Sequence, residues 1–224
     1  MGVKRALGAV AITGAVLLGS AGCYQDDGSE ERTVSYGVAE PVRALVIEGR
    51  TGGIEVRAGD AVRVVERQSY RGDAPDTRHE VRDGTLRLAY DCSDCGVGYQ
   101  VTVPAGTVVR LSSETGGIRL HGLAGEVQAE VGTGGVEGTA LTSPVVRVSA
   151  DTGGIEVAFA ASPTRVEARA VTGGVRVRVP DGEPYAVDAV AGAGDVEVGV
   201  PRQAGAARTI TARTDTGGVA VTGV

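Results

Sequence analysis

Two Asp-Thr-Gly triplets are the residues that could most readily do chemistry in this chain, at 151–153 and 215–217. In aspartic proteases, paired triplets of this kind bring two carboxylates together so that they share one proton. Here each triplet is followed by glycine, and Asp151 and Asp215 stand 64 residues and three copies of a repeat apart. We therefore expect these carboxylates to lie in different layers of a repeating structure, and we predict no catalytic residue.

Cys92 and Cys95, in "DCSDCG", are the only cysteines after Cys23. In an exported protein a local disulfide is the favoured interpretation, ahead of free thiols and of a redox or metal-binding pair. A four-ligand zinc site would also need both histidines of the chain, His79 and His121. We predict no metal and no cofactor.

The first residues have the features of an export signal. Lys4 and Arg5 precede the apolar run "ALGAVAITGAVLL", and the small residues "SAG" lead to Cys23. This stretch resembles the lipobox of bacterial lipoproteins, which implies that residues 1-22 are a signal peptide and that Cys23 carries a lipid. The polar segment "YQDDGSEER" then predicts a flexible, lipid-anchored tether over 23-40. The expected location is the outer face of the cell membrane, or the exterior if Cys23 is not lipidated.

Charge and composition narrow the function and the fold. After removal of residues 1-22 the chain has 20 basic and 28 acidic residues, so nucleic acid is not an expected partner. The sequence has no Trp, one Phe and 36 Gly. Its apolar residues are mainly Val, Ile, Leu and Ala, a composition that suits packing between β-strands. An all-β fold is expected.

A short motif, Thr-Gly-Gly, recurs along most of the chain. It begins at residues 51, 115, 133, 152, 172 and 216, with a degenerate copy, "AGDV", from Ala193. When the copies are aligned on the threonine, the residues six and four before it and three and five after it are apolar, except at Gly138. Two alternating strands joined at a tight bend explain this pattern, because glycine reaches backbone angles that side chains forbid. The predicted structural corners are Gly52, Gly53, Gly116, Gly117, Gly134, Gly135, Gly153, Gly154, Gly173, Gly174, Gly217 and Gly218.

A repeat of about 20 residues buries its apolar columns by stacking one copy on the next. We predict a parallel β-solenoid (β-helix) with two strands per coil over 99-224, preceded by an N-terminal β-strand region over 41-98 that contains an irregular loop. The residue four positions after each threonine points outward. When these residues are compared between coils that follow one another in the sequence, three of the four neighbouring pairs carry opposite charges. These positions are Arg119, Glu137, Glu156, Arg176 and Glu197.

The "G-G-[IV]-x-[VL]" units, with "YQVTVPAGTVVRLSSETGGIRLHGLAGEV" and "VRALVIEGRTGGIEVRAGDAVRVV", resemble the bacterial family of β-strand-repeat proteins labelled putative adhesins, a domain of unknown function. This resemblance implies a β-helical protein of the cell envelope, membrane-anchored and not an enzyme, that acts in surface interaction or envelope stress. Its expected partner is an unidentified envelope component, either a protein or a wall polymer. The alternative is a β-helical glycan lyase or hydrolase using acidic residues such as Glu137 with Glu156. Binding of ice or mineral by stacked threonines ranks below both.

Overall fold

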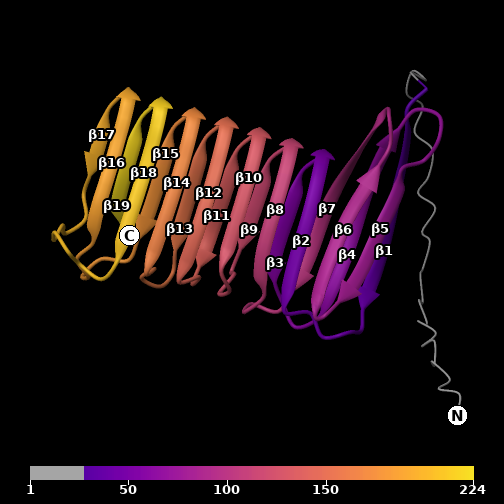
Figure 1. The fold of residues 1–224 in the computed structure, drawn as a ribbon, viewed down its shortest axis with the longest axis horizontal. Helices are drawn as coiled ribbons and strands as arrows, with labels where there is room; N and C mark the ends of the chain where they lie inside the picture. Colours follow the sequence, from indigo (N-terminus) through magenta and orange to yellow (C-terminus); the bar gives the residue numbers. More distant parts are fainter. Residues whose placement is uncertain (1–27) are drawn as a thin grey trace, which may run out of the picture.

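The computed structural model describes residues 28–224, so the predicted signal peptide 1-22, Cys23 and the first part of the tether lie outside the described residues. Within 28–224 the chain is all-β, as predicted, with two large sheets and no helix. None of these residues therefore forms a helix that could cross a membrane. The strands line up along one axis, with the N-terminal strands at one end (Figure 1).

In both sheets the spatial order of the strands differs from their order in the sequence. The first sheet, sheet A, consists in spatial order of β1 (Glu30–Val38), β4 (Val62–Tyr70), β7 (Cys95–Val103), β3 (Ile54–Ala58), β9 (Ile118–His121), β11 (Val136–Leu141), β13 (Ile155–Phe159), β15 (Val175–Val179), β19 (Val219–Gly223) and β17 (Val196–Val198). The second, sheet B, consists of β16 (Ala186–Ala193), β18 (Thr209–Thr216), β14 (Arg165–Thr172), β12 (Val145–Thr152), β10 (Val127–Thr133), β8 (Val108–Thr115), β2 (Ala44–Thr51), β6 (Thr85–Asp91) and β5 (Asp76–Arg82).

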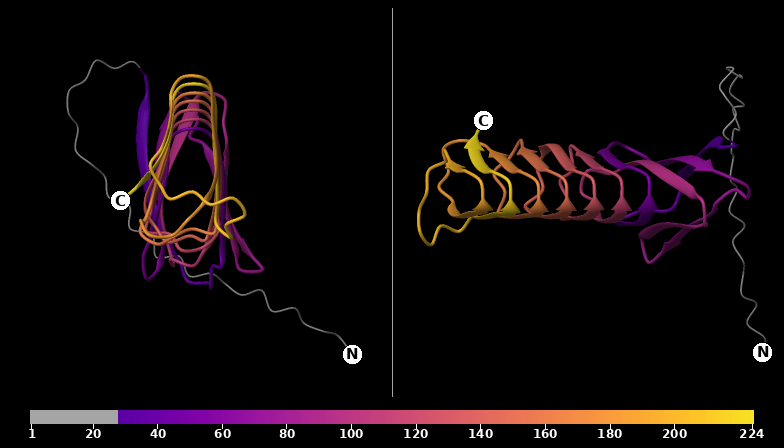
Figure 2. Two further views of the ribbon diagram at one scale, coloured as in Figure 1. Left: turned by 90° about the vertical axis from the view of Figure 1, so that its left-hand side faces the viewer. Right: turned by 90° about the horizontal axis from the view of Figure 1, so that it is seen from above.

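Every copy of the motif contributes one strand to each sheet. The strand before the glycines lies in sheet B, the strand after them lies in sheet A, and equivalent residues of neighbouring copies pair in parallel. Thr133, for example, pairs with Thr115 on one side and with Thr152 on the other. Viewed along the long axis, successive repeats project onto one narrow outline with the glycine corners at one edge (Figure 2).

The apolar columns predicted by the repeat alignment face the space between the sheets. In sheet B, Leu45, Val109, Val127, Val146, Val166 and Ile210 are completely buried. The columns of sheet A are buried in the same way up to β19, and only the outermost strand β17 leaves its column residues Val196 and Val198 partly or largely uncovered. Gly138 is the one break in these columns. The neighbouring Leu141 fills the gap, because it is completely buried and its Cδ1 atom lies 2.9 Å from the position that a Cβ atom on Gly138 would take. The chain reaches this arrangement through an irregular register between Gly138 and Leu141.

Three boundaries differ from those expected. The predicted tether over 23-40 is wrong for its second half, because Glu30–Val38 forms strand β1, paired antiparallel with β4. Part of the expected irregular loop forms strand β5, paired antiparallel with β6. The stack also begins before residue 99, because β2 and β3 pair directly with β8 and β9.

The last two repeats stack in the reverse of their sequence order. β18 lies between β14 and β16 in sheet B, and β19 lies between β15 and β17 in sheet A. The degenerate copy around Ala193 therefore forms the outermost layer, and the C-terminal copy lies inside it. This order corrects the expected neighbour of Arg176, which pairs with Ala220 and not with Glu197.

The N-terminal end is closed by polar and aromatic side chains. The rings of Tyr36 on β1 and His79 on β5 stack with their centroids 4.5 Å apart. Behind them Glu66 is almost fully buried and accepts hydrogen bonds from the Tyr36 hydroxyl (2.8 Å) and from Gln68 Nε2 (3.0 Å). Burial, together with the charge of Glu66 and this hydrogen bond, raises the pKa of Tyr36.

Candidate functional site

A shallow trough of about 640 Å³ crosses the outer face of sheet A, from β9 to β17. It lies beside the corners, where each strand of the sheet begins. Its floor is formed by the second glycine of successive pairs and, in the outermost layer, by an aspartate: Gly117, Gly135, Gly154, Gly174, Gly218 and Asp195. Its side carries the outward residues Arg119, Glu137, Glu156, Arg176, Ala220 and Glu197.

The first glycine of each pair is required by the backbone. Gly153, for example, has φ of +142°, a value that L-residues rarely adopt. A Cβ atom there would overlap the backbone carbonyl of Gly134 in the preceding repeat. The Gly153 N–H also donates to the carbonyl of Thr172 at 2.8 Å, which ties the corner to the next repeat. These glycines are therefore fixed by the geometry of the corner.

The second glycine of each pair is less constrained, and the tightest case is Gly135, where a Cβ atom would lie 3.1 Å from the Gly154 carbonyl oxygen. The φ of the second glycine lies outside the positive range, and a Cβ atom on Gly154 or Gly174 would lie 3.5 Å from its nearest neighbour, an ordinary van der Waals distance. In the degenerate copy the same position is occupied by Asp195, whose side chain is exposed. The corner of the outermost layer thus accepts a side chain here. Glycine at this position leaves the trough floor bare.

The outward residues form a row of mixed charge along the trough. Arg119 Nε lies 3.6 Å from Glu137 Oε2, and Arg176 Nη1 lies 3.1 Å from Glu156 Oε2. Glu137 and Glu156 are directly paired across β11 and β13, so two like charges lie side by side. A second arginine, Arg178, reaches Glu156 Oε1 at 2.7 Å. The row presents basic side chains on both sides of an acidic pair.

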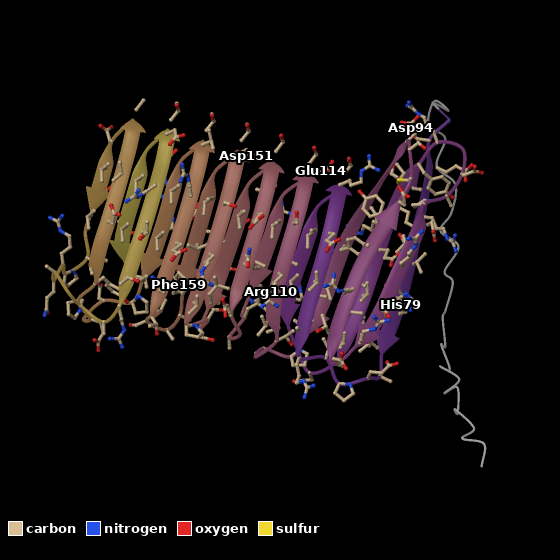
Figure 3. All side chains as sticks on the ribbon, viewed as in Figure 1. His79, Asp94, Arg110, Glu114, Asp151 and Phe159 are labelled. Atoms are coloured by element: carbon tan, nitrogen blue, oxygen red, sulfur yellow. A yellow bond between two sulfur atoms is a disulfide. The ribbon has the colours of Figure 1, made fainter. Side chains whose placement is uncertain are left out.

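The two Asp-Thr-Gly triplets are not brought together. Asp151 and Asp215 lie on the exposed ridge formed by the threonine positions, where Figure 3 labels Asp151 and Glu114. Because the last repeats are exchanged, only β14 separates the two aspartates, which is closer than their order in the sequence implies. Two strand spacings still amount to roughly 9.5 Å, well beyond the distance at which carboxylates share a proton.

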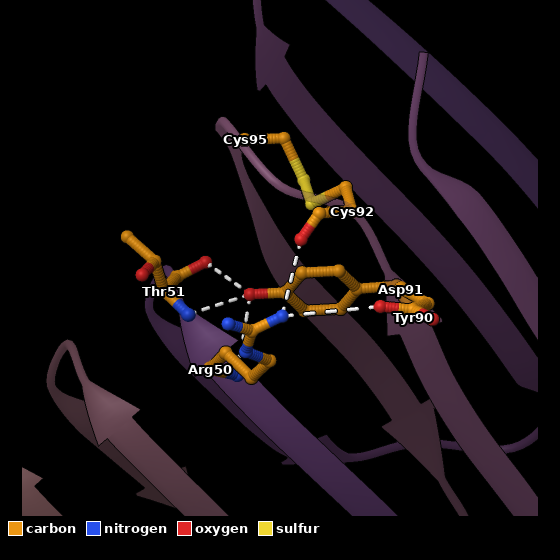
Figure 4. The surroundings of a disulfide bond; sticks show 6 residues. All are labelled: Arg50, Thr51, Tyr90, Asp91, Cys92 and Cys95. Carbon is orange, nitrogen blue, oxygen red and sulfur yellow. Dashed lines mark hydrogen bonds and ion pairs between the residues drawn. A yellow bond between two sulfur atoms is a disulfide. The ribbon is translucent and has the colours of Figure 1, made fainter. Parts of the chain in front are cut away.

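Cys92 and Cys95 form a disulfide at the turn between β6 and β7, beside the first Thr-Gly-Gly corner (Figure 4). The Tyr90 hydroxyl accepts from the Thr51 N–H and donates to the Thr51 carbonyl, the latter at 2.8 Å. Arg50 Nη1 donates to the Cys92 carbonyl at 3.1 Å. Side chains therefore connect this turn to the corner of the next layer.

The histidines do not join the cysteines. His79 stacks on Tyr36, and His121 Nδ1 lies 2.9 Å from the Thr139 hydroxyl on the outer face of sheet A. Within 28–224 there is no group of three or more His, Cys, Asp or Glu residues placed to hold a metal ion.

Two features of the molecule were not anticipated from the sequence. One feature of the sequence pointed to the trough: Asp195 stands in the degenerate copy where the other copies have their second glycine, the residue that forms the trough floor. The buried Glu66 and Gln68 were signalled by the alternation of "VRVVERQSY", which places them on the same face as Val62 and Val64.

No family model and no curated protein matches the sequence. Two solved structures resemble the fold. One is described as a putative cell adhesion protein from Clostridium sporogenes, with 14% identity and a TM-score of 0.52 over 87% of this chain and 100% of that one. The other is described as a putative adhesin from Bacteroides fragilis, with 16% identity and a TM-score of 0.50 over 87% of this chain and 97% of that one. At such identities the likeness extends to the fold.

Proposed function

We propose that this chain is a non-catalytic β-solenoid of the cell envelope that binds an extended segment of a partner protein in the glycine-lined trough. The observation that carries the proposal is the bare floor. A Cβ atom on Gly154, Gly174 or Gly218 would make only ordinary contacts, yet in five neighbouring layers the floor consists of backbone alone. A floor of this kind allows another main chain to approach closely.

The charges along the trough indicate the chemistry of the ligand. Arginine and glutamate side chains both line the floor, with the pair Glu137 and Glu156 between Arg119 and Arg176, so a segment that carries both carboxylates and cationic groups would be complemented. The residues that line the trough include no aromatic side chain, and sugar rings are commonly bound by stacking on aromatic faces. A polypeptide is therefore favoured over a wall glycan.

A photo-reactive amino acid at position 220, on the β19 part of the trough, tests this proposal in intact envelopes. We expect a specific cross-linked protein from position 220 and none from Ser149, a half-buried position on the outer face of sheet B. Filling the floor with Gly154→Ser and Gly174→Ser should abolish the product while the thermal unfolding of the protein is retained. Cross-linking that survives in the filled variant would refute binding in the trough.

The location of the protein belongs to the same proposal. The signal-like residues 1-22 and Cys23 support export and attachment to the outer face of the membrane, and the adhesin names of proteins with this fold are compatible with a surface role. Cys23→Ala should move the protein from the membrane fraction to the soluble exported fraction. Unchanged membrane association would disprove the lipid anchor and leave the trough proposal standing.

A glycan-active enzyme is the second candidate, and one observation favours it. Glu137 and Glu156 are paired on neighbouring strands, which places two carboxylates near one another as glycosidases require. Both are engaged by arginines, however, and Glu137 is exposed whereas Glu156 is half-buried. Release of reducing sugar from wall polymer that is lost in Glu137→Gln and Glu156→Gln would establish this activity.

A further inference from the structure

The two ends of the stack differ in how their edge strands are protected. At the N-terminal end, both edge strands are rich in charged residues. These residues are Glu30, Glu31 and Arg32 on β1 and Asp76, Arg78, Glu80 and Arg82 on β5. Ion pairs join Arg78 to Asp76 (2.7 Å) and Arg82 to Glu80 (2.9 Å). Charged side chains on edge strands prevent the addition of further strands.

At the C-terminal end, this protection is missing from the edge strands β16 and β17. Their sequences, AVDAVAGA and VEV, contain only two charged residues. One of them, Asp188, is paired with Arg213 of the neighbouring strand, and the other is Glu197. Val190 on β16 and Val196 on β17 are each 46% exposed. An apolar edge of this kind is a site for strand pairing.

Backbone groups along this end are available for pairing. Among the strands of residues 28–224, β16 pairs only with β18, and β17 only with β19. Since the Ala186 N–H is directed inward to the Arg208 carbonyl, alternation directs the N–H and C=O groups of Val187, Ala189 and Ala191 outward. The segment 201–203 covers the outer edge only at Tyr185, through two hydrogen bonds of 3.0 Å.

The apolar columns are also left open at this end. Val187, Ala189 and Val198 are half-buried, whereas Ile210, Ala212 and Val221 in the next layer are completely buried. Another layer placed against β16 and β17 would bury these residues as every inner layer does.

We propose that the C-terminal end is an interface that joins two copies of this chain tail to tail through strand addition in both sheets. The partner at this end is a second copy of the chain. A partner that continues both sheets and both sets of apolar columns must present two edge strands at the same separation, and the same end of a second copy does so. Head-to-tail association is disfavoured because it would set the apolar edge against the charged strands β1 and β5. The strands of sheets A and B run in opposite directions (Figure 1), so a two-fold arrangement pairs the edges antiparallel and closes the assembly at a dimer.

Sedimentation of the full chain in mild detergent tests this inference with a matched pair of variants. Val196→Lys places a charge at the open end, outside the trough lining, whereas Val171→Lys places one on β14 in the middle of the stack, where Val171 is 42% exposed. We expect the wild-type chain and Val171→Lys to form dimers and Val196→Lys to be monomeric with unchanged circular dichroism. A monomeric wild-type chain, or a Val196→Lys variant that still dimerises, would overturn the proposal, as would growth into filaments.

Hydrogen exchange distinguishes strand addition from contact through side chains alone. The outward amides of Val187, Ala189 and Ala191 should exchange more slowly as the protein concentration rises, while the edge amides of β5 should not change. Exchange at β16 that does not depend on concentration, in a chain that forms dimers, would exclude the backbone pairing.

Discussion

The middle of the stack and its N-terminal end hold the chain in similar layers by different means. In the middle, the backbone makes the corner: a first glycine with positive φ and one N–H to the next repeat recur in every layer. At the N-terminal end, side chains hold the layers together through the Cys92–Cys95 disulfide, the Tyr90 hydroxyl and the buried Glu66. Inside the stack, the same backbone conformation and hydrogen bond can therefore recur in each layer, whereas the end of the stack needs its own set of side-chain contacts.

The largest effect is expected from a side chain at a first glycine. Gly153→Ala forces alanine to positive φ and pushes its Cβ into the carbonyl of Gly134, which should lower the free energy of unfolding by about 3 to 5 kcal/mol. Urea unfolding followed by circular dichroism measures this loss. A loss below about 1 kcal/mol would show that the corner can relax, and the contrast with the N-terminal end would then disappear.

The next largest effect is expected from opening the disulfide. Cys92 and Cys95 close a ring of only four residues, so the chain-entropy estimate of their contribution is about 2 kcal/mol. The Cys92→Ser, Cys95→Ser double variant should lose this amount, with faster hydrogen exchange confined to β6, β7 and the adjoining corner. Faster exchange in β12 to β15 as well would mean that the two regions do not behave independently.

A smaller effect is expected from removing one hydroxyl of the buried cluster. Tyr36→Phe deletes a hydrogen bond to Glu66 and should cost about 1 to 2 kcal/mol at neutral pH. Thermal unfolding measures the loss. Tyr70→Phe is the control, because the Tyr70 hydroxyl contacts Glu30 at an exposed site and its removal should change stability little. Equal losses in the two variants would contradict a special role for the buried cluster.

The same tyrosine predicts a dependence on alkaline pH. The pKa of Tyr36 is raised in the folded chain, so above the ordinary tyrosine value of about 10 the unfolded state releases its proton first. The contribution of Tyr36 to the free energy of unfolding is therefore fully present below pH 10 and declines as the pH rises above this value. The melting temperature of the wild-type chain should therefore fall more steeply above pH 10 than that of Tyr36→Phe. Parallel curves would show that Tyr36 does not titrate differently in the two states.

The smallest effect on stability is expected from a substitution of Gly154, the residue next to Gly153. Gly154→Ala places a Cβ 3.5 Å from the Gly174 carbonyl, an ordinary contact, and should change the free energy of unfolding by less than about 0.5 kcal/mol. Urea unfolding beside Gly153→Ala gives the comparison directly. A loss as large as that of Gly153→Ala would make the second glycine a structural requirement and remove the main support for the trough.

The sequence predicted the repeating part because every layer repeats the same requirement. Leu45, Val109 and their equivalents occupy one column, and the glycines keep a constant register with it. The order of the last two layers could not be predicted, because Val187 and Ile210 satisfy the same column equally well and either copy can lie next to Val166. Strand β1 was missed because its partner β4 is distant in sequence and most of its residues are polar.

The trough could be predicted only in part. The outward positions Arg119, Glu137, Glu156 and Arg176 follow from strand alternation, and the structure places all four along it. The role of the second glycine did not follow, since only φ and the space around each Cβ distinguish it from the first.

The exchanged order of the last two layers also constrains how the chain can fold. β16 and β17 are synthesised before β18 and β19 but lie outside them, so they cannot dock on their final neighbours until β18 and β19 are present. During synthesis or passage across a membrane, β14 and β15 would have a free edge that the degenerate copy could occupy temporarily. Completion of this end of the stack then requires β18 and β19 to reach β14 and β15 first, which places their pairing before that of β16 and β17 in the order of folding.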